Sequence, residues 1–230
     1  MINSISKYDN RSLQAEKLGD SVAAQLDTAI KTQGYASLAI PGGTTPAPFM
    51  QHLSTCDIDW SKVTVTTTDE RVVDESSERS NAKLVAENLL INRAKTAQFA
   101  SLHLGLDGQG ASLANLNSRV EKLLPLDVCV LGMGADMHIA SLFPKARGLD
   151  KAISIDCEAW VLPVTPASGD EDRITLTASV LASSAHLHLL IVGEEKLNAL
   201  TLAKTISDEK EAPVRVILGH ADLEIHYAES

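Results

Sequence analysis

The feature that most constrains this fold is the alternation, along the whole chain, of short apolar runs with longer patterns of helical period. Apolar side chains recur at helical spacing between Leu13 and Ile30, and Gly34 follows as a stop signal. Similar patterns predict helices at residues 82–95, 112–124 and 195–205. Short apolar runs predict strands at residues 36–40, 63–68, 128–131, 160–164, 187–192 and 214–218. Strands that alternate with helices indicate an α/β, Rossmann-like fold, in which a mainly parallel sheet carries helices on both faces.

Length and composition indicate one globular domain. The 230 residues are 44% hydrophobic and 22% charged, a balance typical of an ordinary folded protein. The sequence contains no internal repeat, no low-complexity tract and no composition break that would mark a linker. We therefore predict a single domain over residues 1–230, since one α/β domain of this size can bury a full core.

Charge and cysteine content narrow the possible partners. A net charge of −10 argues against general affinity for nucleic acid or for an anionic membrane, and an anionic substrate would need a local cationic pocket. Residues 1–13 contain no apolar leader, and no run is long enough to span a membrane, which predicts a cytoplasmic protein. The three cysteines are far apart and suggest neither a disulfide framework nor a zinc site. The oligomeric state stays open.

Polar or glycine-rich segments follow four of the predicted strands. They are residues 41–46, 69–71, 132–138 and 193–196. In open parallel sheets, ligands bind in the crevice beyond the carboxyl ends of the strands. The four segments are therefore expected to meet at one edge of the sheet and to form the functional site there.

The first of these segments has the chemistry of a phosphate-binding turn. Gly42 and Gly43 permit a tight turn with exposed backbone, Thr45 suits a helix N-cap, and Pro46 suits the first helical turn. Free N–H groups and the positive end of a helix favour an anion. The segment matches neither the Walker loop nor the dinucleotide fingerprint. The alternative is a tight turn that binds no ligand.

The second segment combines a carboxylate with a guanidinium. Arg71 could clamp a carboxylate or phosphate in bidentate fashion, and Asp69 could hold a sugar hydroxyl or orient a partner. Most charged triplets are solvated loops, and that alternative applies to residues 69–71 as well.

The third segment contains the strongest candidate for a catalytic base. Gly132 and Gly134 allow close approach of the backbone, and Asp136 lies two residues before His138. A carboxylate near an imidazole can fix its tautomer and stabilise the imidazolium. Although a lone histidine is more often structural, its place after a glycine-rich strand end favours catalysis. The apolar residues 139–144 predict a short packed helix.

Two further cations could bind an anionic substrate. Arg173 precedes an Ile-Thr-Leu run, and Lys196 lies in the first turn of a predicted helix, where a cation is poorly placed for the helix dipole. Either could also be a surface charge. His186 and His188 are interpreted as core or sheet-face residues, because no third ligand is spaced to complete a metal site.

Together these segments resemble the 6-phosphogluconolactonase family over nearly the whole chain. The most specific block is residues 131–144, around His138. The other matching stretches are residues 42–46, 69–71 with 80–81, 173–175 and 192–196. The resemblance implies an α/β fold like that of sugar-phosphate isomerases and glucosamine-6-phosphate deaminase. It also implies hydrolysis of 6-phosphogluconolactone to 6-phosphogluconate, the second step of the oxidative pentose phosphate pathway, with no metal and no organic cofactor.

Two positions depart from the pattern of that family. Met137 stands where glycine usually precedes the motif histidine, and Ile139 stands where the lactonases usually have threonine and the deaminases tend to have isoleucine. Deaminases, however, usually have Asp-Glu-Tyr in place of residues 69–71 and Ala-Phe-Asn-Glu-Pro in place of residues 140–144, so the lactonase interpretation is favoured. Because a positive φ strains methionine, we expect the loop to have relaxed at Met137, with the side chain packed away from the phosphate turn.

The residue types suit hydrolysis of an activated ester without a covalent nucleophile. We predict that His138 deprotonates a water molecule, that Asp136 orients the His138 ring, and that Arg71 or loop N–H groups stabilise the oxyanion. The residues predicted to bind substrate or its phosphate are Gly42, Gly43, Thr44, Thr45, Asp69, Arg173 and Lys196. Two alternatives stay open: a glucosamine-6-phosphate deaminase-like isomerase or deaminase, and a non-catalytic sugar-phosphate sensor on the same fold.

Overall fold

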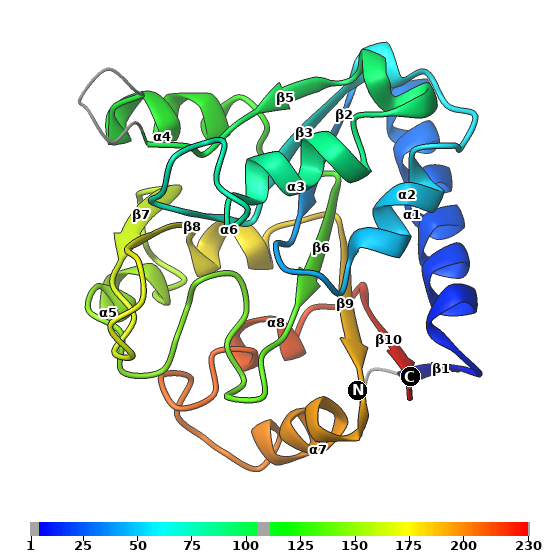
Figure 1. The fold of residues 1–230 in the computed structure, drawn as a ribbon. Helices are drawn as coiled ribbons and strands as arrows, with labels where there is room; N and C mark the ends of the chain where they lie inside the picture. The colour runs from blue at the N-terminus through cyan, green and yellow to red at the C-terminus, as the bar shows by residue number, and fades with distance from the viewer. Residues whose placement is uncertain (1–4, 105–110, 230) are drawn as a thin grey trace.

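The fold is built on a parallel sheet of seven strands, seen in the computed structural model of the chain (Figure 1), which describes residues 5–104 and 111–229. Every neighbouring pair of strands in this sheet is parallel. Across the sheet the order is β1 (Ile5–Tyr8), β10 (Leu223–Ala228), β9 (His186–Val192), β6 (Val128–Gly132), β2 (Ala36–Ile40), β3 (Val63–Thr67) and β5 (Gln98–Ala100). The predicted mainly parallel α/β sheet is therefore confirmed.

Helices cover both faces of this sheet. On β2, Leu38 and Ile40 join one hydrophobic cluster, whereas Ala39 between them joins a second cluster on the opposite face. Side chains alternate across a strand, so each face of β2 packs against its own layer of helices. The first cluster contains side chains of α1 (Arg11–Gln33), α2 (Ala47–Leu53) and α3 (Asn81–Asn88). The second contains side chains of α4 (Leu113–Glu121), α5 (Leu149–Ala152), α6 (Ala178–Ala182), α7 (Glu194–Ala203) and α8 (Arg215–Leu218).

Helix α1 shows how sequence signals set these elements. The side chain of Asn10 accepts a hydrogen bond from the backbone N–H of Leu13 and caps the first turn, and Gly34 ends the helix with a left-handed φ of 90°. Leu18, Val22 and Leu26 recur every four residues and are fully buried. Their spacing forms the stripe that packs on the sheet. In the described part of the chain, no helix is long and apolar enough to cross a membrane.

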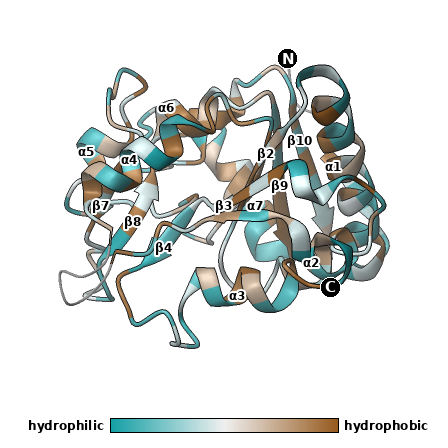
Figure 2. Ribbon diagram, turned by 90° about the horizontal axis from the view of Figure 1, so that it is seen from above, coloured by the Kyte–Doolittle hydropathy of each residue, from teal (hydrophilic) through white to brown (hydrophobic). Residues whose placement is uncertain are grey.

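A second, antiparallel sheet lies beyond the carboxyl end of β3. Its strands are β4 (Asp69–Arg71), β8 (Arg173–Leu176) and β7 (Val161–Val164). Thr68 joins the two sheets, because its N–H donates to the carbonyl of Ile40 and its own carbonyl accepts from the N–H of Leu176. Figure 2 shows β4 mainly hydrophilic, in keeping with its place beyond the carboxyl edge of the main sheet. It shows β9 mainly hydrophobic, in keeping with its place inside that sheet.

Two predicted elements are wrong. Residues 214–218 form no strand, since Arg215–Leu218 is the short helix α8. Residues 139–144 form no helix; Ile139 instead makes isolated bridges to Met133 and Leu142. The predicted helix at 82–95 is interrupted, because α3 ends at Asn88 and a 3-10 helix follows at Asn92–Thr96. A second 3-10 helix, Trp60–Lys62, precedes β3.

Candidate active site

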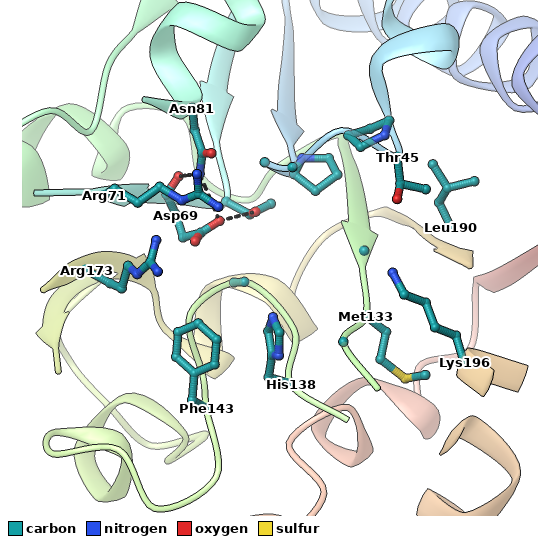
Figure 3. Close-up of a pocket in the computed structure, with 18 residues that line it drawn as sticks. Thr45, Asp69, Arg71, Asn81, Met133, His138, Phe143, Arg173, Leu190 and Lys196 are labelled. Atoms are coloured by element: carbon teal, nitrogen blue, oxygen red, sulfur yellow. Dashed lines mark hydrogen bonds between the residues drawn. The ribbon is translucent and has the colours of Figure 1, made fainter. Parts of the chain in front are cut away.

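A cavity of ≈ 340 Å³ opens at the carboxyl edge of β2, β3 and β6 (Figure 3). All four polar segments that follow the predicted strands contribute to its lining. The predicted site residues that line it are Gly42, Gly43, Thr45, Asp69, Arg71, His138, Arg173 and Lys196. The convergence expected from the fold is therefore present. Thr44 is exposed to solvent and does not line the cavity, and Asp136 contributes through its contact with His138.

The glycine-rich turn after β2 is shaped by close packing. A Cβ atom on Gly42 would lie only 2.1–2.4 Å from the side-chain amide of Asn81, so glycine is required there. Gly43 has a φ of 84°, in the left-handed region that glycine adopts without strain. Helix α2 is capped by Pro46 with no side-chain hydrogen bond, so the prediction that Thr45 is its N-cap is wrong. Thr45 points toward the cavity instead (Figure 3).

Strand β4 brings a carboxylate and a guanidinium to the cavity wall. Its antiparallel register with β8 sets Asp69 opposite Thr175 and Arg71 opposite Arg173. The hydroxyl of Ser141 donates to Asp69 Oδ2 over 2.5 Å, which fixes the carboxylate beside the His138 loop. These residues form a paired strand, so the alternative of a solvated charged loop is wrong.

Glu70 points away from the cavity and anchors α3. Its buried carboxylate accepts hydrogen bonds from the backbone N–H groups of Asn81 and Ala82, both over 2.7 Å, and of Arg71 over 2.8 Å. Burial raises the pKa of Glu70, although these hydrogen bonds oppose the shift. The anchored helix presents Asn81, whose side-chain NH₂ donates to the carbonyl of Asp69 and which lines the cavity.

Arg71 and Arg173 form a pair of partly uncompensated cations. The Nε atoms of both are buried and have no hydrogen-bond partner among the residues that the structure describes. Burial, followed by the neighbouring Arg71 charge, lowers the pKa of Arg173. Figure 3 shows the two guanidinium groups near one another at one side of the cavity. Two guanidiniums that face one cavity with unpaired N–H groups favour an anionic ligand.

His138 lies in a tight loop after β6. The loop is closed by backbone hydrogen bonds of 3.0 Å from Gly134 N to His138 O and from Met137 N to Gly134 O. A Cβ on Gly134 would lie 2.3 Å from the His138 ring and 2.4 Å from Asp136, so any side chain there would displace these two groups. The Asp136 Oδ1 atom lies 2.5 Å from His138 Nδ1. Burial acts to raise the pKa of Asp136, but the hydrogen bond and charge of His138 lower it on balance.

Met137 adopts the left-handed backbone region that glycine populates without strain. Its φ is 68°, so the expectation of a relaxed loop is wrong. Its N–H donates to Gly134 O and its carbonyl accepts from the N–H of Val214, each over 3.0 Å, and these two bonds hold the conformation in place. The Met137 side chain packs against the second hydrophobic cluster, the one that contains side chains of α4 to α8, and does not line the cavity, as expected.

Phe143 is a site residue that we did not single out from the sequence. Its ring centroid lies 4.3 Å from that of His138, and the Arg173 guanidinium lies 5.8 Å from the Phe143 ring centre. Phe143 therefore separates the imidazole from the guanidinium. The only signal for it was its membership of the block at 131–144.

Lys196 reaches the cavity from α7, on the side opposite the arginine pair. Figure 3 shows His138 between Lys196 and Arg173. Burial lowers the pKa of Lys196, which indicates that its ammonium is partly withdrawn from water. The cavity thus has cations on both sides of the imidazole. Among residues 5–104 and 111–229, neither cluster of side chains that could hold a metal ion includes a residue of this cavity.

The sequence and the fold both match known proteins. Residues 9–225 match the family described as glucosamine-6-phosphate isomerases/6-phosphogluconolactonase. A 6-phosphogluconolactonase of Rhizobium meliloti is 42% identical over 224 residues, which are 96% of this chain and 97% of the relative. One of Pseudomonas aeruginosa is 41% identical, over 93% of this chain and 90% of the relative. The crystal structure of a 6-phosphogluconolactonase from Shewanella baltica superimposes with a TM-score of 0.90 at 34% identity, over 99% of each chain.

Proposed function

The chain belongs to the glucosamine-6-phosphate isomerase/6-phosphogluconolactonase family, and we propose that it hydrolyses 6-phospho-D-glucono-1,5-lactone to 6-phosphogluconate. That reaction is the second step of the oxidative pentose phosphate pathway. The relatives that are 41–42% identical over more than nine-tenths of this chain carry the name of this activity. The observation that carries the mechanism is the His138 imidazole, which lines the cavity while Asp136 occupies its Nδ1 atom.

His138 acts as the general base in this proposal. With Nδ1 held by Asp136, the ring presents Nε2 as the free acceptor, and a water molecule between Nε2 and the lactone carbonyl would lose its proton to the ring. The imidazolium that forms is stabilised by the Asp136 carboxylate 2.5 Å away. A lactone is an activated ester, so attack by this water requires no covalent intermediate.

The cations of the cavity accommodate two anionic groups, the substrate phosphate and the oxyanion of the transition state. The phosphate of the substrate sits against the Gly42–Thr45 turn, and Lys196 and Arg173 reach it with long side chains from opposite sides. Arg71, or an N–H group of the His138 loop, stabilises the oxyanion that develops at the lactone carbonyl. Asp69, fixed by Ser141, accepts a hydrogen bond from a sugar hydroxyl. Binding the remote phosphate orients the carbonyl toward the activated water.

The decisive experiment is a lactonase assay on the purified protein. We expect consumption of 6-phosphogluconolactone well above its spontaneous hydrolysis, and no release of ammonia from glucosamine 6-phosphate in a parallel assay. Ammonia release would favour the deaminase alternative. Binding of sugar phosphate without turnover of either compound would favour the sensor.

A further inference from the structure

Three potential metal ligands converge outside the active site, where α1 meets α2. They are Asp20 on α1, His52 on α2 and Cys56 just after α2, and we refer to them as the α1–α2 triad. One ligand atom from each lies within 4.8 Å of the other two. The His52 Nε2 atom already lies 2.9 Å from Asp20 Oδ1. A modest adjustment of side chains is therefore enough to place all three around one ion.

The local backbone favours this convergence. His52 and Cys56 are four residues apart, which sets both on the same side of the chain at the end of α2, where the Cys56 thiol contacts the His52 carbonyl over 3.7 Å. A Cβ on Gly19 would lie 2.5 Å from Cδ2 of His52, so the absence of a side chain at Gly19 allows the ring to reach Asp20. His52 and Asp20 are 32% and 53% exposed, so an ion can enter from solvent.

A second cluster on the molecule does not fit a metal ion. It consists of His188, Glu224 and His226. Each ring nitrogen of the two histidines is engaged in a side-chain hydrogen bond, to Tyr8, to Gln25 or to the other ring. Both rings are buried, so an ion would have to break this chain of hydrogen bonds without access from solvent. In the α1–α2 triad the His52 ring is hydrogen-bonded through Nε2 as well, but its partner Asp20 is itself a proposed ligand, and both side chains are reached by solvent.

We propose that the α1–α2 triad binds one zinc-like divalent cation, with water as the fourth ligand. Thiolate, imidazole and carboxylate together are a donor set that Zn²⁺ accepts in tetrahedral geometry. Without metal, burial and then the Asp20 charge raise the pKa of Cys56, so the thiol keeps its proton. Coordination forms the metal–sulfur bond and releases that proton to solvent. The two anionic ligands then neutralise the dication.

The ion would fasten α2 to α1. Helix α2 follows the glycine-rich turn directly, with Pro46 as its N-cap, so His52 lies on the helix that continues from the proposed phosphate site. None of its three residues lines the active-site cavity. The metal is therefore expected to stabilise the fold and to take no part in the hydrolysis.

The test uses Co²⁺ as a spectroscopic probe of the full-length chain, kept reduced by a phosphine. We expect the wild-type chain to bind a single Co²⁺ with a thiolate-to-cobalt charge-transfer band, and Zn²⁺ to displace it. Cys56→Ser should abolish the band, and His52→Gln and Asp20→Asn should each weaken binding by about tenfold or more. Gly19→Ala removes no ligand but displaces the His52 ring, and it should also weaken binding.

His186→Gln is the matched control, because His186 pairs with Asp222 and lies outside the triad. Binding should be unchanged in this variant. Zn²⁺ should raise the thermal midpoint of the wild-type chain and leave that of Cys56→Ser unchanged, which also shows whether each variant folds. A wild-type chain without the band, or an equal band in Cys56→Ser, would overturn the proposal. Chelation should leave kcat unchanged in every variant, so this test fails or succeeds separately from the lactonase assay.

Discussion

The proposed general base is oriented through two atoms, His138 Nδ1 and Asp136 Oδ1, which lie 2.5 Å apart. The contact can exist because Gly134 leaves room for both side chains. Phe143 then packs against the ring and limits its rotation. A fixed imidazole loses less freedom when it enters the transition state, which is the advantage of a preorganised base.

We expect His138→Asn to fold normally and to lose kcat by about 100-fold or more, because asparagine cannot accept a proton at neutral pH. Steady-state kinetics corrected for spontaneous lactone hydrolysis measure this loss. Affinity for 6-phosphogluconate should change little, since the phosphate contacts remain. A near-normal kcat would show that His138 is not the base, and the carboxylates of Asp69 and Asp136 would be the next candidates.

Met137→Gly tests the strained residue beside the proposed base. Glycine adopts the φ of 68° without strain, but it loses more freedom on folding and gives up the packing of the Met137 side chain, so we expect the free energy of unfolding to fall by about 1 kcal/mol. The Met137 side chain does not line the cavity, and kcat/KM should stay within about tenfold of wild type. Denaturant unfolding and kinetics of the same samples give both numbers. A much larger gain in kcat/KM would show that methionine impairs the site.

At the scale of elements, strand β8 and helix α7 place Arg173 and Lys196 on opposite sides of the cavity. Arg173→Ala and Lys196→Ala should each weaken the charge-assisted contact with phosphate by about 1.5–3 kcal/mol. The preference for phosphorylated over unphosphorylated lactone, measured as a ratio of kcat/KM values, should fall accordingly. Lys204→Ala, at the C-cap of α7, is the control, because Lys204 is exposed and does not line the cavity. An unchanged preference in both site variants would remove them from the phosphate site.

The elements that sequence patterns predicted well are those with one dominant signal. Helix α1 has a regular apolar stripe and two caps, and β2 is an uninterrupted apolar run. Strand β10 was missed because Glu224 and His226 interrupt its apolar pattern, and both lie beside His188 only after β9 and β10 pair. The short apolar run at residues 214–218 was predicted as a strand but forms helix α8. Such a run is compatible with either element, and tertiary packing decides between them.

The site residues divide in the same way, into those that a sequence pattern predicts and those that depend on tertiary contacts. Gly42, Asp69 and His138 each follow a predicted strand, so the parallel-sheet rule brought them to one edge without any knowledge of distances. Asn81 and Phe143 could not be placed in this way. Asn81 reaches the cavity because Glu70 anchors the start of α3, and that contact spans 11 residues of sequence. The α1–α2 triad depends likewise on the packing of two helices.

At the scale of the whole molecule, one edge of the main sheet contains a chain of hydrogen-bonded polar side chains, with two buried histidines at its centre. Tyr8 on β1 contacts His226 on β10 over 2.9 Å, His226 contacts His188 on β9 over 3.1 Å, and His188 contacts Gln25 on α1 over 2.8 Å. If Tyr8 donates to His226, His226 to His188 and His188 to Gln25, every ring nitrogen is satisfied while both rings are neutral. A second proton on His188 would set its Nδ1–H against the Nε2–H of His226. A second proton on His226 would require the Tyr8 hydroxyl to turn and accept from Nδ1–H.

This chain of hydrogen bonds makes the fold sensitive to acid. Burial, followed by the charges of His226 and His186, lowers the pKa of His188 to about 3, and burial lowers the pKa of His226 to about 4. Unfolded histidine has a pKa of about 6.5, so between that pH and the folded values the unfolded chain binds more protons. The two histidines therefore do not affect the free energy of unfolding above a pH of about 6.5, and they lower it as the pH falls below that value. The free energy of unfolding should decrease by up to about 1.4 kcal/mol per pH unit for each ring.

Urea unfolding at several pH values between about 7 and 4 tests this expectation. The buried carboxyl of Glu70, whose pKa is raised by burial, acts with the opposite sign at the acid end of this window, because it favours the protonated form in the folded state. Glu224, whose carboxylate lies 3.8 Å from His226, can offset part of the cost of protonating that ring. The measurement is therefore the difference in slope between wild type and the double variant His188→Gln, His226→Gln, which keeps Glu70 and Glu224 in place. We expect a shallower slope in the variant, whatever its stability at neutral pH, and equal slopes would show that the two rings do not control the acid sensitivity of the sheet edge.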